Sequence, residues 1–196
     1  MVKVKSSRNK FLAMFSVVFC MAALFCGSIN AYNLYNNQSR MIGGVSGRDY
    51  YLESSATTYS SIISEAMDAW IYANWSNPIL FYDRGLSSNT SITFKGYSTI
   101  PNAPSANAMV KHYSASGIYM PQPSANWKYC DVLISQTKFS QITSREKLIT
   151  IVHELGHCFG LQHETSNRGV IMYYDINTIQ TSTPQYDDID GINYLY

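Results

Sequence analysis

The sequence predicts one α+β domain, in which a twisted sheet is covered by two long helices and followed by a third helix at the C-terminus. Three observations lead to this fold class. The length of 196 residues suits one domain with a sizeable core. Two long segments, residues 58–75 and 143–158, have the spacing of amphipathic helices. Several short apolar segments, bounded by loops, have the length and composition of strands.

Each element is predicted from its local pattern. The first long helix has one apolar stripe, formed by Ile62, Ile63, Ala66, Met67, Trp70 and Ile71. The strand candidates are residues 49–53, 79–82, 91–97, 109–113, 117–120 and 129–135. Thr143 and Glu146 fit a capping box, which predicts the start of the second long helix, and residues 185–196 form the last one. Residues 33–46 are rich in Asn, Gly and Ser and are predicted to be a loose lead-in.

The N-terminus predicts a secretory signal peptide. Basic residues at the very start precede an apolar run over residues 11–26, and small residues follow up to Ala31. This order is typical of a signal peptide over residues 1–31, which leaves a secreted, extracellular domain over residues 32–196. The alternative is an uncleaved membrane anchor, because residues 11–29 carry no charge and approach the length that spans a bilayer.

The charge and the cysteines limit the expected partners and bonds. Loss of residues 1–31 changes the net charge from +1 to −3, because ten basic and thirteen acidic residues remain. No basic patch is left, so we expect no nucleic-acid partner. Cys130 and Cys158 remain in this part of the chain. Outside the cell they could form a disulfide, and the alternative is two buried free thiols.

Three of the four histidines, His153, His157 and His163, lie within eleven residues. Positions i and i+4 share one face of a helix, so His153 and His157 can both reach one ion. Gly160 permits the chain to leave the helix, so that His163 can turn back as a third ligand. Neutral imidazole suits zinc, and a catalytic zinc needs three such ligands and an open fourth position. We therefore expect one zinc ion at this segment.

Glu154 lies between the first two histidines and is placed to act as a general base. If a water is the fourth zinc ligand, its pKa falls, and Glu154 can take its proton and pass it to the leaving amine. One alternative is a helix with surface histidines and no metal. Another is a closed structural zinc site, for which His112 or Cys130 would supply the fourth ligand.

A longer pattern emerges with the next segment, Gly-Val-Ile-Met-Tyr-Tyr at residues 169–174. With it, the sequence resembles the metzincin zinc peptidases, in which an extended histidine motif is followed by a methionine-containing turn. The matching residues are His153, Glu154, His157, Gly160, His163 and Met172. Residues 187–196 are similar to the closing helix of matrixin catalytic domains, so the resemblance is to the matrixin-like branch. It covers about residues 32–196, although its specific motifs lie towards the C-terminus.

The resemblance implies a metzincin or zincin-like fold, whose twisted sheet is mostly parallel with an antiparallel edge strand. It implies that Met172 is the hydrophobic floor of the site, where the residue alone would indicate a core methionine. Asp187 and Asp188, which the helix dipole also favours, would bond to the methionine turn and, in matured enzymes, to the new N-terminal amine. Tyr174 is placed where astacin- and serralysin-like relatives keep a tyrosine that leans on zinc or the oxyanion; the alternative is a packed tyrosine. Residues 117–120 would be the edge strand with which a peptide substrate pairs.

The sequence also departs from these relatives. We find no cysteine-switch propeptide, and a single histidine, His112, is too little for the second zinc site of animal matrixins. Calcium could accompany zinc, although no calcium site is evident in the sequence.

Together these observations predict a secreted zinc endopeptidase that hydrolyses peptide or protein substrates with a zinc-bound water and Glu154 as the base. Contact with a membrane would be limited to the signal segment. One alternative is a zinc amidase with a narrow cell-wall or non-protein target. Another is a non-catalytic, secreted zinc-binding protein, although such a protein has no use for the general base Glu154.

Overall fold

The computed structural model describes residues 32–196, so the signal peptide predicted over residues 1–31 lies outside the described residues. The described residues belong to a unit of their own, Ala31–Tyr196. Among them, no helix is both long enough and apolar enough to cross a membrane.

A six-stranded sheet forms the centre of this unit, with the strand order β2-β1-β3-β6-β4-β5. The strands are β1 (Ser46–Leu52), β2 (Leu80–Asp83), β3 (Thr90–Tyr97), β4 (Ala108–Tyr113), β5 (Tyr119–Met120) and β6 (Tyr129–Ser135). The first four strands in the sheet order are parallel, whereas β4 runs antiparallel to β6, and β5 antiparallel to β4. The α+β class and the mostly parallel sheet are therefore confirmed.

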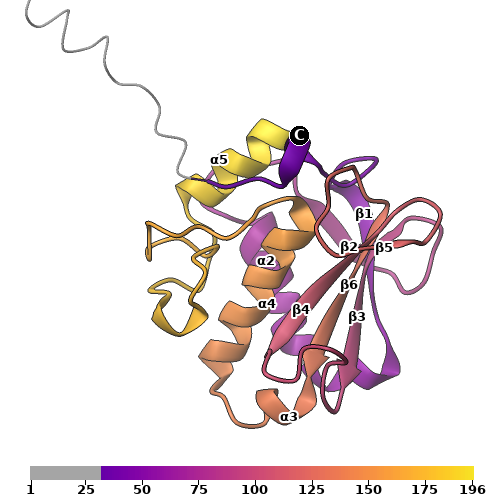
Figure 1. Cartoon of the computed structure of the whole chain (residues 1–196), viewed down its shortest axis with the longest axis vertical. Helices are drawn as coiled ribbons and strands as arrows, with labels where there is room; N and C mark the ends of the chain where they lie inside the picture. Colours follow the sequence, from indigo (N-terminus) through magenta and orange to yellow (C-terminus); the bar gives the residue numbers. More distant parts are fainter. Residues whose placement is uncertain (1–31) are drawn as a thin grey trace, which may run out of the picture. The chain divides into compact units, whose positions relative to one another are not determined.

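Two long helices, α2 (Ser60–Ile71) and α4 (Ser144–Phe159), pack side by side on one face of the sheet (Figure 1). Trp70 is fully buried between them, as the apolar stripe predicts. Its indole N–H donates to the Val152 carbonyl of α4 over 2.9 Å, and its ring meets Phe159 edge to face. These contacts hold α4 in one position along α2.

Both ends of α4 follow from the local sequence. The Thr143 hydroxyl accepts from the Glu146 N–H at 3.3 Å, and the Glu146 carboxylate accepts from the Thr143 N–H at 2.7 Å, so the predicted capping box is confirmed. At the other end, Gly160 has a φ of 114°. A residue with a side chain rarely adopts that angle, and glycine adopts it readily. The chain therefore leaves the helix at Gly160, shortly after the second histidine, His157.

The remaining elements differ more from the prediction. The C-terminal helix α5 (Tyr186–Leu195) lies where it was expected, whereas four short helices were not predicted: η2 (Asn36–Gln38), η3 (Ser54–Tyr59), α3 (Gln136–Phe139) and η4 (Ile176–Thr178). The prediction of a loose lead-in is wrong, because Leu34 forms a bridge with Leu161, and Met41 forms one with Trp127. These partners are distant in the sequence, so local composition does not reveal them.

Candidate metal centre

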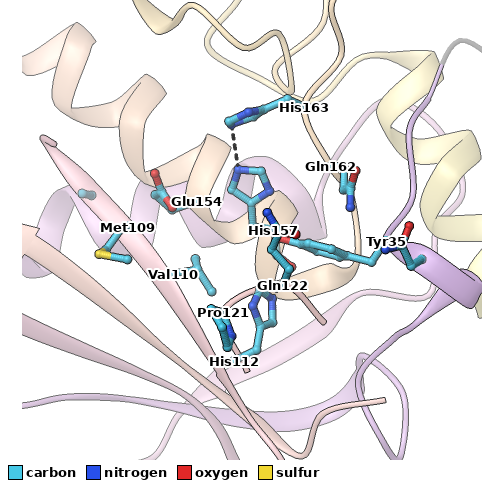
Figure 2. A pocket seen from close by; sticks show the side chains of 12 residues that line it. Tyr35, Met109, Val110, His112, Pro121, Gln122, Glu154, His157, Gln162 and His163 are labelled. Carbon is cyan, nitrogen blue, oxygen red and sulfur yellow. Dashed lines mark hydrogen bonds between the residues drawn. The ribbon is translucent and has the colours of Figure 1, made fainter. Parts of the chain in front are cut away.

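Three histidines meet at the end of α4. His153 and His157 lie one turn apart on the helix, and His163 comes from the loop that follows Gly160. One nitrogen of each ring lies within 4.8 Å of the other two. The Nε2 atom of His163 is 3.1 Å from Nε2 of His153. It is also 3.1 Å from Nε2 of His157, a contact that the dashed line in Figure 2 marks. The predicted ligands are thus brought together.

In His153 and His157, the hydrogen bond of Nδ1 determines which ring nitrogen carries the proton and which keeps a lone pair. Nδ1 of His153 is 2.8 Å from the Ile171 carbonyl oxygen, and Nδ1 of His157 is 2.8 Å from the Leu161 carbonyl oxygen. A carbonyl oxygen only accepts, so both Nδ1 atoms carry the proton and both Nε2 atoms keep a lone pair. His163 can offer one Nε2 proton at most, so its two short contacts are not both hydrogen bonds. At least one of these close nitrogen–nitrogen contacts therefore has no proton to share, so it is unfavourable unless a cation lies between the two nitrogens.

The residues present fit a zinc ion. Nitrogen ligands at about 2.0–2.1 Å from a tetrahedral zinc lie about 3.3 Å apart, close to the observed 3.1 Å. Burial lowers the pKa of His153 to about 4, and it also lowers the pKa values of His157 and His163. All three rings are therefore neutral at neutral pH, which is the form that binds metal.

The described residues offer three ligand nitrogens at this centre and no fourth ligand. Within residues 32–196, no further histidine, cysteine or acidic residue joins the three histidines as a possible ligand. His112 instead has its Nε2 atom 3.0 Å from the His157 carbonyl oxygen, and the Cys130 thiol faces the Cys158 carbonyl oxygen at 4.0 Å. Both cysteines are buried free thiols in this structure. The closed site considered from the sequence therefore gains no fourth ligand.

Glu154 lies beside the histidines and outside the ligand group. It lines a cavity of about 610 Å³ together with His157 and His163 (Figure 2). Its side chain is buried, and this burial raises its pKa to about 8, opposed by a hydrogen bond from the Val110 backbone. A dication at the histidines would favour the carboxylate and oppose the same shift. Glu154 is thus a buried carboxyl group that lines the same cavity as two of the three histidines.

A second cavity, of about 340 Å³, reaches the same centre from another side. His153, Glu154, His163 and Tyr174 all contribute to its lining. Tyr174 is 55% exposed, so it is not a packed core tyrosine. It stands at the rim of the site.

Asp188 holds the loop beneath the histidines. Its carboxylate accepts from the backbone N–H groups of Ile171 at 3.0 Å and Met172 at 3.3 Å. Ile171 in turn presents its carbonyl oxygen to His153. Burial raises the pKa of Asp188 to about 6, opposed by its backbone hydrogen bonds. The neighbouring Asp187 accepts from the Asn167 side chain instead, at 3.2 Å.

Met172 is buried against α4, at a position where the helix has a glycine. A Cβ atom at Gly156 would overlap the Met172 sulfur and come within 3.1 Å of the Trp70 ring. Sequence reasoning did not single out Gly156, although a glycine inside a helical pattern is a recognisable sign of close packing. Met172 can pack against the turn of α4 that carries His153 and His157 because Gly156 has no side chain there.

Sequence reasoning also missed Glu164, which joins the third histidine to the methionine turn. Its backbone N–H donates to the Met172 carbonyl at 2.7 Å. Its buried carboxylate accepts from the N–H groups of Thr165 at 2.8 Å and Ser166 at 2.6 Å. No local pattern marks this role, because one acidic residue in a loop is common.

The strand beside the site is not the one that was expected. β5, within residues 117–120, is one of the two edge strands of the sheet, but it has only two residues and pairs with His112 and Tyr113. Ala108, Met109 and Val110 of β4 line the larger cavity instead. The strand next to the cleft is therefore β4.

Comparisons with known proteins bear on this centre. The matrixin family profile matches residues 53–196, and a search of curated proteins finds no match. Among solved structures, a chain in the GM1-bound form of the ECX AB5 holotoxin is similar with a TM-score of 0.51 and 17% identity, over 86% of this chain and 90% of that chain. At that identity the likeness shows the fold alone. Because the family profile spans most of the sequence and includes all three histidines, the chain belongs to the matrixin family of zinc metallopeptidases.

Proposed function

We propose that the chain is a secreted zinc endopeptidase in which Glu154 acts as the general base. The observation that carries this proposal is the set of three converging Nε2 atoms with Glu154 beside an open position. When bound there, zinc would supply a Lewis acid that polarises the scissile carbonyl and acidifies a water molecule. Hydrolysis also needs a group that moves protons, which a purely structural zinc site lacks.

Glu154 supplies that group. It accepts one proton from the attacking water, whose oxygen bonds to the carbonyl carbon of the substrate. The carbon–nitrogen bond then breaks, and Glu154 returns the proton to the leaving amine. A buried carboxyl group that lines the same cavity as His157 and His163 suits both steps, because it can take the proton from the water and hold it until the amine leaves.

β4 offers the substrate a place to bind. One edge of β4 pairs with β6 along its whole length, while the other pairs with β5 only at His112 and Tyr113. Within the described part of the sheet, residues 108–111 therefore have no strand partner on that edge, although the Val110 backbone forms a hydrogen bond with Glu154. An extended peptide can pair with this edge as an added strand. Its side chains would then reach the two cavities that flank Glu154.

Secretion is the second part of the proposal. It is supported by the basic start and apolar run within residues 1–31. Expression of the full chain in a secreting host should release a protein that begins at Tyr32, as read by N-terminal sequencing. A membrane-bound product that retains residues 1–31 would support the anchor instead.

The test of the activity is cleavage of a mixed peptide library by residues 32–196, which form a unit of their own. We expect cleavage that a chelator abolishes and added zinc restores. If the zinc-loaded protein cuts no peptide, the endopeptidase proposal is wrong. Cleavage of cell-wall peptides alone would favour the amidase, and zinc binding without any cleavage would favour a binding protein.

A further inference from the structure

We propose that residues Asn33–Tyr35, here called the N-terminal strap, position two of the three histidines and thereby set the affinity for the metal. The inference rests on the proposed function only in that the histidines bind zinc; it does not require catalysis. It concerns the segment directly after the predicted cleavage site, which the sequence marks as a loose lead-in.

The strap pairs with the loop that carries the third histidine. Leu34 forms an antiparallel bridge with Leu161, and the Gln162 N–H donates to the Asn33 carbonyl at 2.7 Å. The Asn33 side-chain amide donates to the His163 carbonyl at 2.9 Å. His163 lies outside the helix, so its position depends on contacts of this kind.

Tyr35 supports the second histidine from the same segment. Its ring centre lies 6.4 Å from that of His157, 5.1 Å from that of His112 and 5.6 Å from that of Trp127. His112 in turn contacts the His157 carbonyl oxygen. Figure 2 shows Tyr35 next to His157 at the wall of the larger cavity. The strap thus reaches His163 through Asn33 and His157 through Tyr35.

The consequence for metal binding follows from conformational entropy. The loop between His157 and His163 must be ordered for three nitrogens to meet, and ordering a loop costs conformational entropy. If a weakened strap lets the loop occupy other conformations, the apparent affinity falls by the fraction that remains competent. Cleavage after Ala31 keeps the strap, whereas removal of residues 32–35 deletes it. The position of the new N-terminus therefore sets how tightly zinc is held.

The experiment compares variants of residues 32–196 in zinc affinity, measured by competition with a chromogenic chelator and by the absorption spectrum of bound Co²⁺. Asn33→Ala removes the bond to His163, and Tyr35→Leu removes the ring beside His157. Tyr35→Phe keeps the ring and serves as the conservative rescue. Asn193→Ala is the matched control, because the Asn193 amide donates to the Ser76 carbonyl over the same 2.9 Å at an exposed position on α5.

We expect Asn33→Ala and Tyr35→Leu to bind zinc about tenfold or more weakly, which is the usual effect of removing an outer contact of a metal site. Tyr35→Phe and Asn193→Ala should bind it as the parent does. Parent-like affinity in Asn33→Ala would overturn the proposal, and so would an equal loss in Asn193→Ala. No peptide enters this assay, so it does not depend on catalysis. A parent that binds zinc but cuts nothing would overturn the proposed function, whereas the proposed role of the strap in zinc affinity would stand.

Discussion

At the scale of single residues, the ligands depend on groups that never touch the metal. Asp188 is 2% exposed and lies on α5, whereas His153 lies on α4, and Asp188 still reaches His153 through the backbone of Ile171. Such outer contacts keep an imidazole in one tautomer and one orientation. The groups that bind and orient the ligands therefore come from α4, the methionine turn and α5.

Replacement of Asp188 tests this connection. We expect Asp188→Ala to lower the free energy of unfolding by about 1–3 kcal/mol, because backbone N–H groups lose their buried acceptor. Zinc affinity should fall about 10–100-fold, as measured by chelator competition. Asp187→Ala is the control, since that carboxylate accepts from Asn167 and not from the methionine turn. Equal zinc affinities in the two variants would contradict the connection.

Gly156 gives a second prediction at this scale. Alanine favours a helix over glycine by about 1 kcal/mol, yet Gly156→Ala should destabilise the protein. The added methyl group overlaps the buried Met172 sulfur and crowds Trp70, and overpacking of a core costs about 1–3 kcal/mol. The measurement is the urea midpoint of the metal-free protein. A midpoint above that of the parent would show that Met172 can move away at little cost.

At the scale of elements, the histidine helix α4 is the segment that the sequence defines best. Thr143, Glu146 and Gly160 mark its two ends through contacts within a few residues, so local patterns suffice. The strands were also found, because alternation and strand length are local properties. The short helices η2, η3, α3 and η4 were missed, since they have three to six residues each and too few positions to show a period.

The capping box makes α4 sensitive to acid. Hydrogen bonds from Thr143 lower the pKa of the exposed Glu146 carboxyl below its ordinary 4.5. A depressed pKa contributes stability that is present above the unfolded-state pKa and is lost as the pH falls through the folded-state value. The urea midpoint of the parent should therefore exceed that of Glu146→Gln at pH 6, and the difference should shrink by pH 3. A difference that is the same at both pH values would contradict the linkage.

Thr143→Ala tests the other half of the box. Loss of a threonine N-cap costs about 1 kcal/mol in the free energy of unfolding. Thr137→Ala, at an exposed position on α3, is the control and should have a much smaller effect. If both variants unfold at the same urea concentration, the cap does not limit the stability of α4.

At the scale of the whole molecule, the centre is assembled from segments far apart in the chain. The ligands and Glu154 could be predicted, because they share one helix and the loop after it. The strap, the β4 edge and the support from Glu164 could not. Their partners are set by how the sheet and helices pack, and single residues such as Asn33 carry no local mark of a long-range contact. Tyr35 and Trp127 were missed for the same reason.

Metal removal should therefore affect the whole unit. Zinc that binds only the folded chain stabilises it by about 2.7 kcal/mol at a free concentration one hundred times the dissociation constant. We expect the thermal midpoint to fall when a chelator is added and to recover with zinc. His153→Ala should show neither change. A chelator response in His153→Ala equal to that of the parent would place the metal elsewhere.

The most direct test of the central claim is the turnover of Glu154→Gln with its zinc content measured in the same sample. Glutamine keeps the size of the side chain and lies outside the ligand group, but it cannot accept and return the proton. We predict one zinc per chain, held as tightly as in the parent, with peptide cleavage reduced by about 10²–10⁴-fold or more. Cleavage at the parent rate by the zinc-loaded variant would contradict the account.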